Sequence, residues 1–398
     1  MIKLLYSLFM ASLAPLMQEI AAIFSSKTKQ RLDALKTQNL KSKIYKNSIW
    51  IHCSSLGEYE MAKPLIRSFK NQNLLISFFS PSGYNQCLET ETLKKLYLPL
   101  DSEKAAKEAF ENLEPKAFIL IKYEFWLNFM TESINQKVPI YLVSGLFRKN
   151  HFLSKTYAKP WRNVLGRFNR LYLQNHGSMD LAKEWGFGNT TFSGDLRFNQ
   201  VAFTKTQEED NPILKHFVSE SEKVIILGSS WPAEEKLMSM AKLKPGTKLI
   251  IAPHDLKQEH LALIAKLFKD SQLYSAYKKD NNCNVLILNT MGMLKHAYQY
   301  AQLAFVGGGF GKGLHNILEP MTYGLPVMFG PKHAKFPEAL AAMKQGIARQ
   351  VNNKEDLETA INNFDHSNLD HGVKIKEWML SNTVDLENIN QQIVSDIN

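Results

Sequence analysis

In the first half of the chain, short apolar runs alternate with longer amphipathic stretches. The apolar runs are SIWIHC, LLISFF, KLYLPL, AFILIK, PIYLVS and RLYLQN, and segments such as EMAKPLIRSFKN and AAKEAFENL separate them. Apolar runs of this length between helical stretches are typical of the strands of a parallel sheet. The pattern therefore predicts a doubly wound α/β domain over residues 27–200.

The same alternation resumes after a polar segment. Residues 201–221, VAFTKTQEEDNPILKHFVSES, contain no strand of their own and are interpreted as a linker. The runs KVIILGSS, KLIIAPHD, NVLILNT, LAFVGGG and PVMFG then predict a second parallel sheet over residues 222–375, and residues 376–398 are predicted to be helical. Two Rossmann-like halves that face each other are expected to leave a ligand-binding cleft at the carboxyl ends of their strands.

The N-terminal segment MIKLLYSLFMASLAPLMQEIAAIF is apolar, but Gln18 and Glu19 interrupt it and Pro15 lies in its middle. It is therefore too polar for a clear membrane span. Seven Lys and Arg residues and a single acid follow between Lys27 and Lys46. We expect residues 1–26 to form a helix that associates with an anionic membrane surface. An amphipathic helix that covers a core or a partner is the alternative.

Composition adds two constraints. The chain has 398 residues, 44% hydrophobic and 22% charged, which fits a globular protein of two domains. Its net charge of +10 indicates an anionic partner, which could be nucleic acid, a phosphorylated small molecule or a membrane. The three cysteines have neither zinc-site nor disulfide spacing, and this is typical of a reducing compartment.

The densest local signal is a run of four glycines between Gly307 and Gly311, followed by Gly313. Such a loop before a helix can present backbone N–H groups to an anion. It is not a Walker A loop, because Gly313 follows Lys312 where Ser or Thr is required, and Lys312 also replaces the third glycine of the dinucleotide fingerprint. Glu319, in the first turn of the following helix, is either a helix cap or a ligand for the hydroxyls of a ribose.

Polar side chains also follow several other predicted strands. Glu58 and Glu60 come after the first strand, Glu124 lies among aromatic residues after the fourth, and His254 follows a strand of the second half. A carboxylate in such a place either caps a helix or takes part in chemistry, and one among aromatic rings is paired with a cation or has a raised pKa. The chain contains no DxD sequence and no metal-ligand spacing, so we expect no metal in the mechanism.

Six motifs carry a family resemblance. They are SSLGE, KYEFW and GDLRFN in the first half and GSSWPAEE, NTMGML and FVGGGFGKGLHNILEP in the second. Together, and in this order, they resemble the 3-deoxy-D-manno-octulosonic acid (Kdo) transferases, which build the inner core of lipopolysaccharide. The resemblance covers nearly the whole chain, including the apolar N-terminus.

The resemblance implies a GT-B fold, with an acceptor site in the N-terminal Rossmann-like domain and a nucleotide-sugar site in the C-terminal one. It implies an inverting, metal-independent glycosyltransferase that moves Kdo from CMP-Kdo to lipid IVA at the cytoplasmic face of the inner membrane. In this chemistry CMP-Kdo is a co-substrate, so no cofactor is expected. The anionic partners would be the membrane surface and the substrates rather than nucleic acid.

The resemblance also assigns residue roles. Glu58 of SSLGE would be the general base on the acceptor hydroxyl, whereas Glu60 lies outside the motif and is expected to begin a helix. Glu124 of KYEFW and Arg197 of GDLRF would stabilise charge in the transition state. The positions that bind the nucleotide would be Pro253, His254, Met291, Gly292, Met293, Asn316, Ile317, Leu318 and Glu319.

The chain departs from the family pattern at three places. Arg197 stands where Lys is common, Met293 where Glu is common, and Pro253-His254 where Pro-Arg-His is common. Arg197 keeps the positive charge, whereas Met293 can offer a ligand only its backbone.

Two other interpretations stay open. One is a GT-B enzyme that uses a UDP-sugar and another acceptor, and the other is a non-enzymatic basic module for membranes or nucleic acid. Against the module, the glycines and acids gather at strand ends and the positive charge forms no stripe interleaved with aromatic residues.

Overall fold

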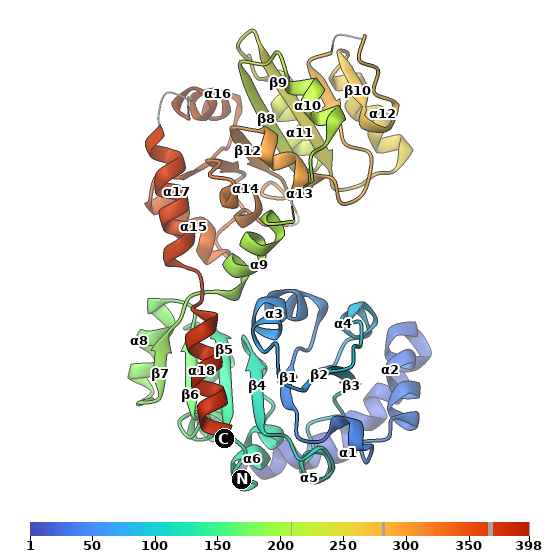
Figure 1. Cartoon of the computed structure of the whole chain (residues 1–398), viewed down its shortest axis with the longest axis vertical. Coiled ribbons are helices and arrows are strands. Elements are labelled where there is room, and N and C mark those ends of the chain that lie inside the picture. Colours follow the sequence, from blue (N-terminus) through green and yellow to red (C-terminus); the bar gives the residue numbers. More distant parts are fainter. Residues whose placement is uncertain (208, 281–282, 312, 365–368, 398) are drawn as a thin grey trace. The chain divides into compact units, whose positions relative to one another are not determined.

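The structure is a computed structural model that describes residues 1–207, 209–280, 283–311, 313–364 and 369–397. It divides into two compact units. Unit 1 comprises Met1–Gln200 together with the residues from Asn382 onward, and unit 2 comprises Val201–Ser381. Each unit is a parallel sheet with helices on both faces (Figure 1).

The sheet of unit 1 has the strand order β3-β2-β1-β4-β5-β6-β7, and all of its neighbouring strands are parallel. The strand order reverses between β1 and β4, because β1 pairs with both β2 and β4. This is the topological switch point of a Rossmann-like sheet. The strands are β1 (Ile49–His52), β2 (Leu74–Phe78), β3 (Leu93–Tyr97), β4 (Ala117–Ile121), β5 (Ile140–Gly145), β6 (Arg170–Leu173) and β7 (Thr190–Phe192).

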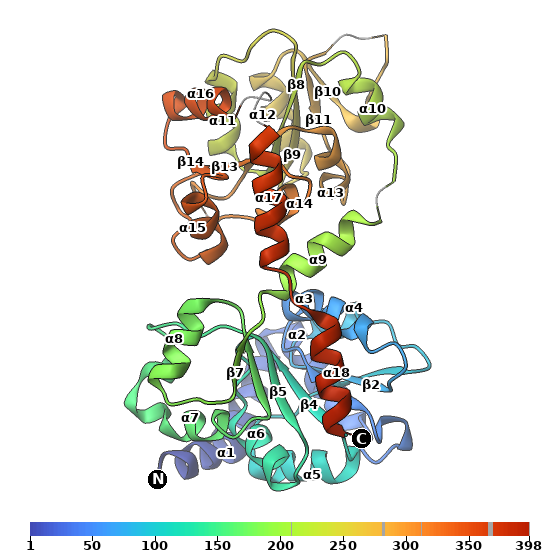
Figure 2. The ribbon, with the colours of Figure 1, turned by 60° about the vertical axis from the view of Figure 1, so that its left-hand side comes forward.

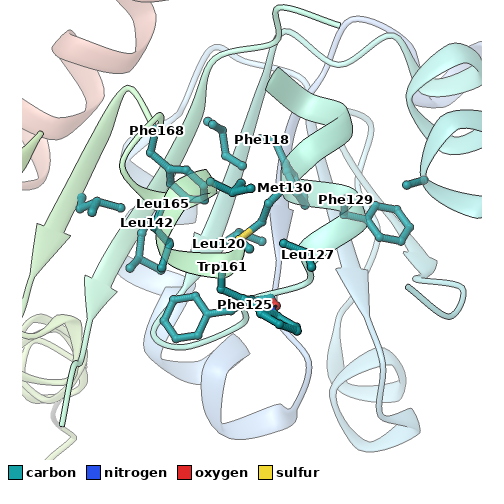
Figure 3. Packing of buried hydrophobic residues seen from close by; sticks show 14 of the residues in the cluster. Phe118, Leu120, Phe125, Leu127, Phe129, Met130, Leu142, Trp161, Leu165 and Phe168 are labelled. Carbon is teal, nitrogen blue, oxygen red and sulfur yellow. The ribbon is translucent and has the colours of Figure 1, made fainter. Parts of the chain in front are cut away.

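Alternate residues of these strands enter two separate cores. Trp50 and Phe118 point to one face, whereas Ile49, Ile51 and Ile119 point to the other. Because both faces are buried, the strands read as continuous apolar runs. Figure 3 shows the first core, in which α6 and α7 pack on β4 and β5. The helices of unit 1 are α3 (Leu56–Ser68), α4 (Pro81–Gln86), α5 (Glu103–Leu113), α6 (Leu127–Asn135), α7 (Lys159–Leu165) and α8 (His176–Glu184).

The first two helices of unit 1 are α1 (Ile2–Phe24) and α2 (Ser26–Thr37). They pack against each other and against the rest of unit 1. Helix α1 is long and apolar enough to cross a membrane by length and composition, and its most apolar window is only 11% buried. Its exposed apolar side chains are Ile2, Leu4, Leu5, Leu8, Phe9, Leu13, Leu16, Met17, Ile20, Ile23 and Phe24.

The sheet of unit 2 has the order β10-β11-β9-β8-β12-β13-β14 and is also parallel throughout. Its strands are β8 (Lys223–Ser230), β9 (Thr247–Pro253), β10 (Ser271–Leu273), β11 (Val285–Ile287), β12 (Leu303–Val306), β13 (Val327–Phe329) and β14 (Ala348–Gln350). Its helices are α10 (Pro212–Val218), α11 (Pro232–Met240), α12 (Gln258–Leu267), α13 (Leu294–Ala297), α14 (Leu318–Thr322), α15 (Pro337–Lys344), α16 (Lys354–Asn363) and α17 (Leu369–Ser381).

Two parallel seven-stranded sheets confirm the predicted α/β fold class. The sequence patterns nevertheless missed β7, β10 and β14, each of which has three residues. All three lie at an edge of their sheet, where one side of the strand has no neighbour. Such short edge strands carry little apolar signal, and TTF, SQL and ARQ show why they read as loops.

Two segments differ from the sequence-based division. The stretch expected to be a linker, residues 201–221, contains the end of α9 (Leu196–Lys205) and all of α10. The C-terminal segment 376–398 does not form one piece, because α17 belongs to unit 2 and α18 (Leu386–Ile397) to unit 1 (Figure 2). Helix α18 packs against α3, and Ile389 and Ile393 complete the second core of unit 1.

Candidate active site

Glu58 lies where β1 gives way to α3, in the first turn of the helix. A capping box holds it there: the Ser55 N–H donates to Glu58 Oε2 at 3.1 Å, and the Glu58 N–H donates to Ser55 Oγ at 3.4 Å. These bonds satisfy two N–H groups at the start of the helix and fix the direction of the carboxyl group. Glu58 is only 8% exposed, so a carboxyl group is buried at the end of the central strand.

The structure corrects the expectation for Glu60. Helix α3 begins at Leu56, and its capping glutamate is Glu58, not Glu60. Glu60 instead pairs with Lys63 one turn later, with Oε1 2.6 Å from Nζ. Glu58 therefore combines a helix cap with a buried position beside a second acid, while Glu60 makes an ordinary ion pair on the helix surface.

Glu124, which follows β4, is the second acid of the site. Its Oε2 accepts hydrogen bonds from Ser54 Oγ and, at 2.7 Å, from Trp126 Nε1, and His52 Nε2 lies 3.7 Å away. Strands β1 and β4 are neighbours in the sheet, and this pairing brings the SSLGE and KYEFW motifs together. The sequence left two alternatives for Glu124, a cation partner or a raised pKa, and the raised pKa is wrong, because these contacts accompany a lowered one.

The pKa values of the two carboxyl groups are shifted in opposite directions. Burial, then the charge of Glu124 and a hydrogen bond with it, raise the pKa of Glu58 to about 8. Burial would also raise the pKa of Glu124, but its interaction with His52 and its other hydrogen bonds prevail and lower that pKa to about 2. Two acids this close cannot both ionise readily, so at neutral pH the pair holds one proton, on Glu58.

A chain of hydrogen bonds behind Glu124 explains its low pKa, and the sequence did not reveal it. The Trp50 indole N–H donates to Ser77 Oγ at 2.8 Å, and Ser77 Oγ lies 2.8 Å from His52 Nδ1. If Ser77 gives its single proton to Nδ1, His52 Nε2–H faces Ser54 Oγ at 3.1 Å, and Ser54 in turn donates to Glu124. Trp50, Ser77, His52 and Ser54 then each donate to the next group in the chain, and the last acceptor is the ionised carboxylate of Glu124.

Arg197, at the start of α9, is bound to a buried acid of its own unit. Its Nε and Nη2 donate to Asp195 Oδ2 at 2.8 and 2.6 Å, and Asp195 is 5% exposed. Two donors on one carboxylate fix the plane of the guanidinium group. The structure thus shows how Arg197 is oriented, and its contact with a substrate stays a prediction.

In unit 2, three rings that follow three separate strands pack together, and the His254 ring stacks on both of the others. The rings of Trp231 and His254 are 4.7 Å apart and those of His254 and His315 are 4.6 Å apart, both nearly parallel. Trp231 Nε1 also donates to His315 Nε2 at 3.2 Å. Burial and then His254 lower the pKa of His315. His254 itself is exposed, while Pro253 is buried at the end of β9.

The glycine loop after β12 differs from its expected role. The N–H groups of Gly308 and Phe310 donate to Oε1 of Glu234, a fully buried carboxylate at the start of α11. The chain itself therefore supplies the anion for these two N–H groups. The glycines instead allow close packing: a Cβ at Gly307 would lie 2.2 Å from the Ser229 carbonyl oxygen. The loop joins β12 tightly to β8, its neighbour in the sheet.

We predict that Gly309→Ala lowers the free energy of unfolding by about 1–3 kcal/mol, because overpacking forces the backbone apart. A Cβ at Gly309 would lie 2.5 Å from the backbone nitrogen of Gly330. Gly311→Ala is the matched control, since no atom lies within 4 Å of a Cβ there. Urea unfolding of both variants tests this, and equal midpoints for the two would contradict a packing role.

The remaining predicted nucleotide positions divide into exposed and buried residues. Asn316 is exposed, and its Nδ2 donates to Glu319 Oε1 at 3.1 Å. Burial, partly offset by Asn316 and then Lys295, raises the pKa of Glu319. Ile317 and Leu318 are buried in the core, so any contact with a ligand would be through their backbone.

The loop before α13 carries the other three positions. Met291 is 83% exposed and Gly292 has a φ of +81° with open space around its Cα, whereas Met293 is half-buried at the start of α13. In the part of the chain that the structure describes, no three His, Cys, Asp or Glu side chains gather as metal ligands would.

Comparison with known proteins supports the predicted family. Residues 15–200 match the family described as 3-Deoxy-D-manno-octulosonic-acid transferase (kdotransferase). A 3-deoxy-D-manno-octulosonic acid transferase from Aquifex aeolicus is 26% identical over 328 residues, which are 79% of this chain and 85% of that protein. The first half of the chain thus matches the Kdo transferase family, and the likeness to this relative extends over 79% of the chain. These matches support the predicted family.

A second relative is longer than this chain. The bifunctional glycosyltransferase/methyltransferase of Fusobacterium nucleatum is 27% identical over 339 residues, 80% of this chain, but the match spans only 52% of the relative's length. Among solved structures, UDP-GlcNAc 2-epimerase from Neisseria meningitidis, bound to UDP-GlcNAc, gives a TM-score of 0.57 at 13% identity and covers 88% of this chain and 99% of its own. That likeness shows the fold alone, two Rossmann-like units of GT-B type.

Proposed function

We propose that this protein transfers Kdo from CMP-Kdo to lipid IVA, with inversion at the anomeric carbon and without a metal ion. The observation that carries the proposal is the pair of a buried Glu58 and a half-buried Glu124, in a chain whose relatives are named Kdo transferases. An inverting transfer needs one base on the face opposite the leaving nucleotide. The proposed place of action is the cytoplasmic face of the inner membrane, with α1 at its surface.

In this proposal, the acids of unit 1 have different tasks. Glu58, once deprotonated, takes the proton of the acceptor hydroxyl, and its raised pKa makes it a stronger base than an ordinary carboxylate. Glu124 stays ionised and stabilises the positive charge that develops on the sugar ring. Arg197, oriented by Asp195, balances the negative charge of the Kdo carboxylate and the phosphate.

Unit 2 is proposed to bind CMP. The exposed His254 ring, backed by His315, offers the cytosine a flat surface for stacking. Asn316 and Glu319 are held together and can accept from and donate to ribose hydroxyls, beside the backbone of Ile317 and Leu318. Pro253 and the exposed loop of Met291, Gly292 and Met293 complete the proposed binding positions. No further cofactor is proposed.

The direct test is nucleotide release and product mass. The protein is incubated with lipid IVA and either CMP-Kdo or UDP-GlcNAc. We expect release of CMP and a mass increase of the lipid by whole Kdo units with the first donor alone. Turnover with UDP-GlcNAc and none with CMP-Kdo would instead favour a GT-B enzyme that uses a UDP-sugar.

The activity should depend on the proton of Glu58. Because the pKa of Glu58 is raised to about 8, the base is mostly protonated at neutral pH and becomes active as pH rises. We expect kcat/KM to rise tenfold per pH unit below about pH 8 and to level off above it. A profile that is flat between pH 7 and 9, roughly one unit on either side of the expected inflection at about pH 8, would contradict the base role.

A further inference from the structure

Helix α1 is tied along unit 1 near both of its ends. Tyr6 OH donates to Asp101 Oδ2 at 2.7 Å, Ser7 Oγ donates to Asn128 Oδ1 at 2.9 Å, and near the other end Gln18 accepts from an arginine of α2. A helix that crossed a bilayer would have to break these bonds and leave polar groups without partners. The ties instead hold α1 flat on unit 1, with its apolar side chains facing outward.

A groove of about 360 Å³ runs beside α1, between α1, α2 and the segment after β2. Its walls are mainly apolar, and Met17, Ala21, Phe79 and Pro81 contribute to them. Lys27 and Arg31 of α2 add positive charge. The groove therefore offers an apolar channel with a cationic side, open at the apolar face of α1.

Arg31 is unusual because its charge is buried without a counter-ion. The residue is 3% exposed, and its two terminal nitrogens donate to neutral oxygens, those of the Gln18 side chain at 3.0 Å and the Leu98 backbone at 2.6 Å. Within the described ranges, its Nε has no hydrogen-bond partner and no carboxylate pairs with it. Burial lowers the pKa of Arg31 only to about 10, so it stays charged at neutral pH.

A row of side chains joins this charge to the acid pair. The Arg31 guanidinium carbon lies 4.0 Å from the centre of the Phe79 ring, and that ring is 5.4 Å from Trp126. Trp126 donates to Glu124. Two aromatic side chains, Phe79 and Trp126, would thus separate the charged end of the groove from Glu124.

We propose that this groove binds the lipid acceptor itself: an anionic group of the acceptor pairs with Arg31 and Lys27, and one acyl chain lies against Met17, Ala21 and Phe79. The inference rests on the proposed function, since that function makes the acceptor an acylated anionic sugar. Buried charges in proteins are normally paired, and an anionic headgroup supplies the missing partner. The flat position of α1 would let the chain enter from the membrane surface.

A second cavity provides the control. It has a volume of about 370 Å³ and lies on the other flank of α1, where Ala22 lines it. Glu19 and Asp33 line it together with Lys29 and Lys36, so its charges balance, whereas the groove is lined by cations without an acid and is better suited to an anionic lipid. Ala21 and Ala22 are adjacent in the sequence, yet one faces the proposed groove and the other faces the control cavity.

The binding test uses thiol alkylation of the full chain. The three native cysteines are buried, so Ala21→Cys and Ala22→Cys each introduce an accessible thiol. We expect dodecyl phosphate at ten times its Kd to slow alkylation at position 21 about tenfold, following 1 + [L]/Kd, and to leave position 22 unchanged. No protection, or equal protection at both positions, would overturn the proposal. Equal protection by uncharged dodecyl maltoside would overturn the pairing with Arg31 and Lys27.

The kinetic test asks whether the groove serves the acceptor. Ala21→Trp fills the groove from an exposed helix position and should raise the KM for lipid IVA about tenfold with little change in kcat, because it removes binding that is uniform along the reaction. Ala22→Trp should leave the KM for lipid IVA at its wild-type value, and Ala21→Trp should leave the KM for a deacylated acceptor unchanged. An unchanged KM for Ala21→Trp would overturn the proposal. If the wild-type protein transfers no Kdo at all, the proposed function fails, while the alkylation test still decides the groove.

Discussion

Glu58→Gln should abolish most of the transfer activity, with kcat reduced by a factor of about 10² or more, because an amide cannot accept the proton of the acceptor hydroxyl. The fold should survive, since an amide oxygen can still accept from the Ser55 N–H and preserve the capping box. Initial rates of CMP release with CMP-Kdo and lipid IVA measure the loss, and far-UV circular dichroism checks the fold.

Glu60→Gln is the matched control for that variant. Glu60 lies two positions further along α3 and makes only a surface ion pair with Lys63, so its loss should change the rate by less than about twofold. If the two variants lose activity equally, the loss reflects damage to α3 and Glu58 is not the base. Near-normal turnover by Glu58→Gln would also show that Glu58 is not the base.

Glu124→Gln should produce a second large loss, about 10²-fold on the high-pH plateau, because it removes the ionised group proposed to stabilise the transition state. It should also move the pH profile. The charge of Glu124 is one reason why the pKa of Glu58 is raised to about 8, so the inflection should fall below pH 8. It should stay above the ordinary value of 4.5, because burial, the largest cause of the shift, remains.

The pH profile separates this role from simple structural damage. A misfolded fraction lowers the plateau without moving the inflection, whereas loss of the neighbouring charge moves it. An inflection that stays at about pH 8 in Glu124→Gln would show that the two acids do not share a proton. The double variant with Glu58→Gln should lose little more than Glu58→Gln alone, since residues that act as a unit are not additive.

The sequence predicted most of the fold because both sheets are buried on both faces. The central strands β1, β4, β8 and β12 are continuous apolar runs, so the sequence alone identifies them as buried strands. The edge strands β7, β10 and β14 escape this rule. The return of α18 to unit 1 could not be predicted either, because an amphipathic pattern shows that a helix has a buried face but not which core receives it.

The sequence predicted the two acids of the candidate site, but not the buried polar residues that hydrogen-bond around them. Motif resemblance selects Glu58 and Glu124, but His52 and Ser77 lie inside strands, where a polar residue reads as a packing exception until its neighbours are known. The same holds for Glu234, which looks like one of two helix-starting acids and turns out to hold the glycine loop. A signal did exist in each case: a polar residue in an apolar run must find buried partners.

Because α18 supplies Ile389 and Ile393 to the core beneath α3, the helix that presents Glu58 is completed by residues that are synthesised after unit 2. On the ribosome, the sheet of unit 1 emerges first, but the apolar surface around α3 has to wait until the whole of unit 2 has been translated. Domains usually fold in the order of their synthesis. Here the proposed base would acquire its final setting only after α18 has followed unit 2 out of the ribosome, so a nascent chain that ends within unit 2 would not yet carry a finished acceptor site.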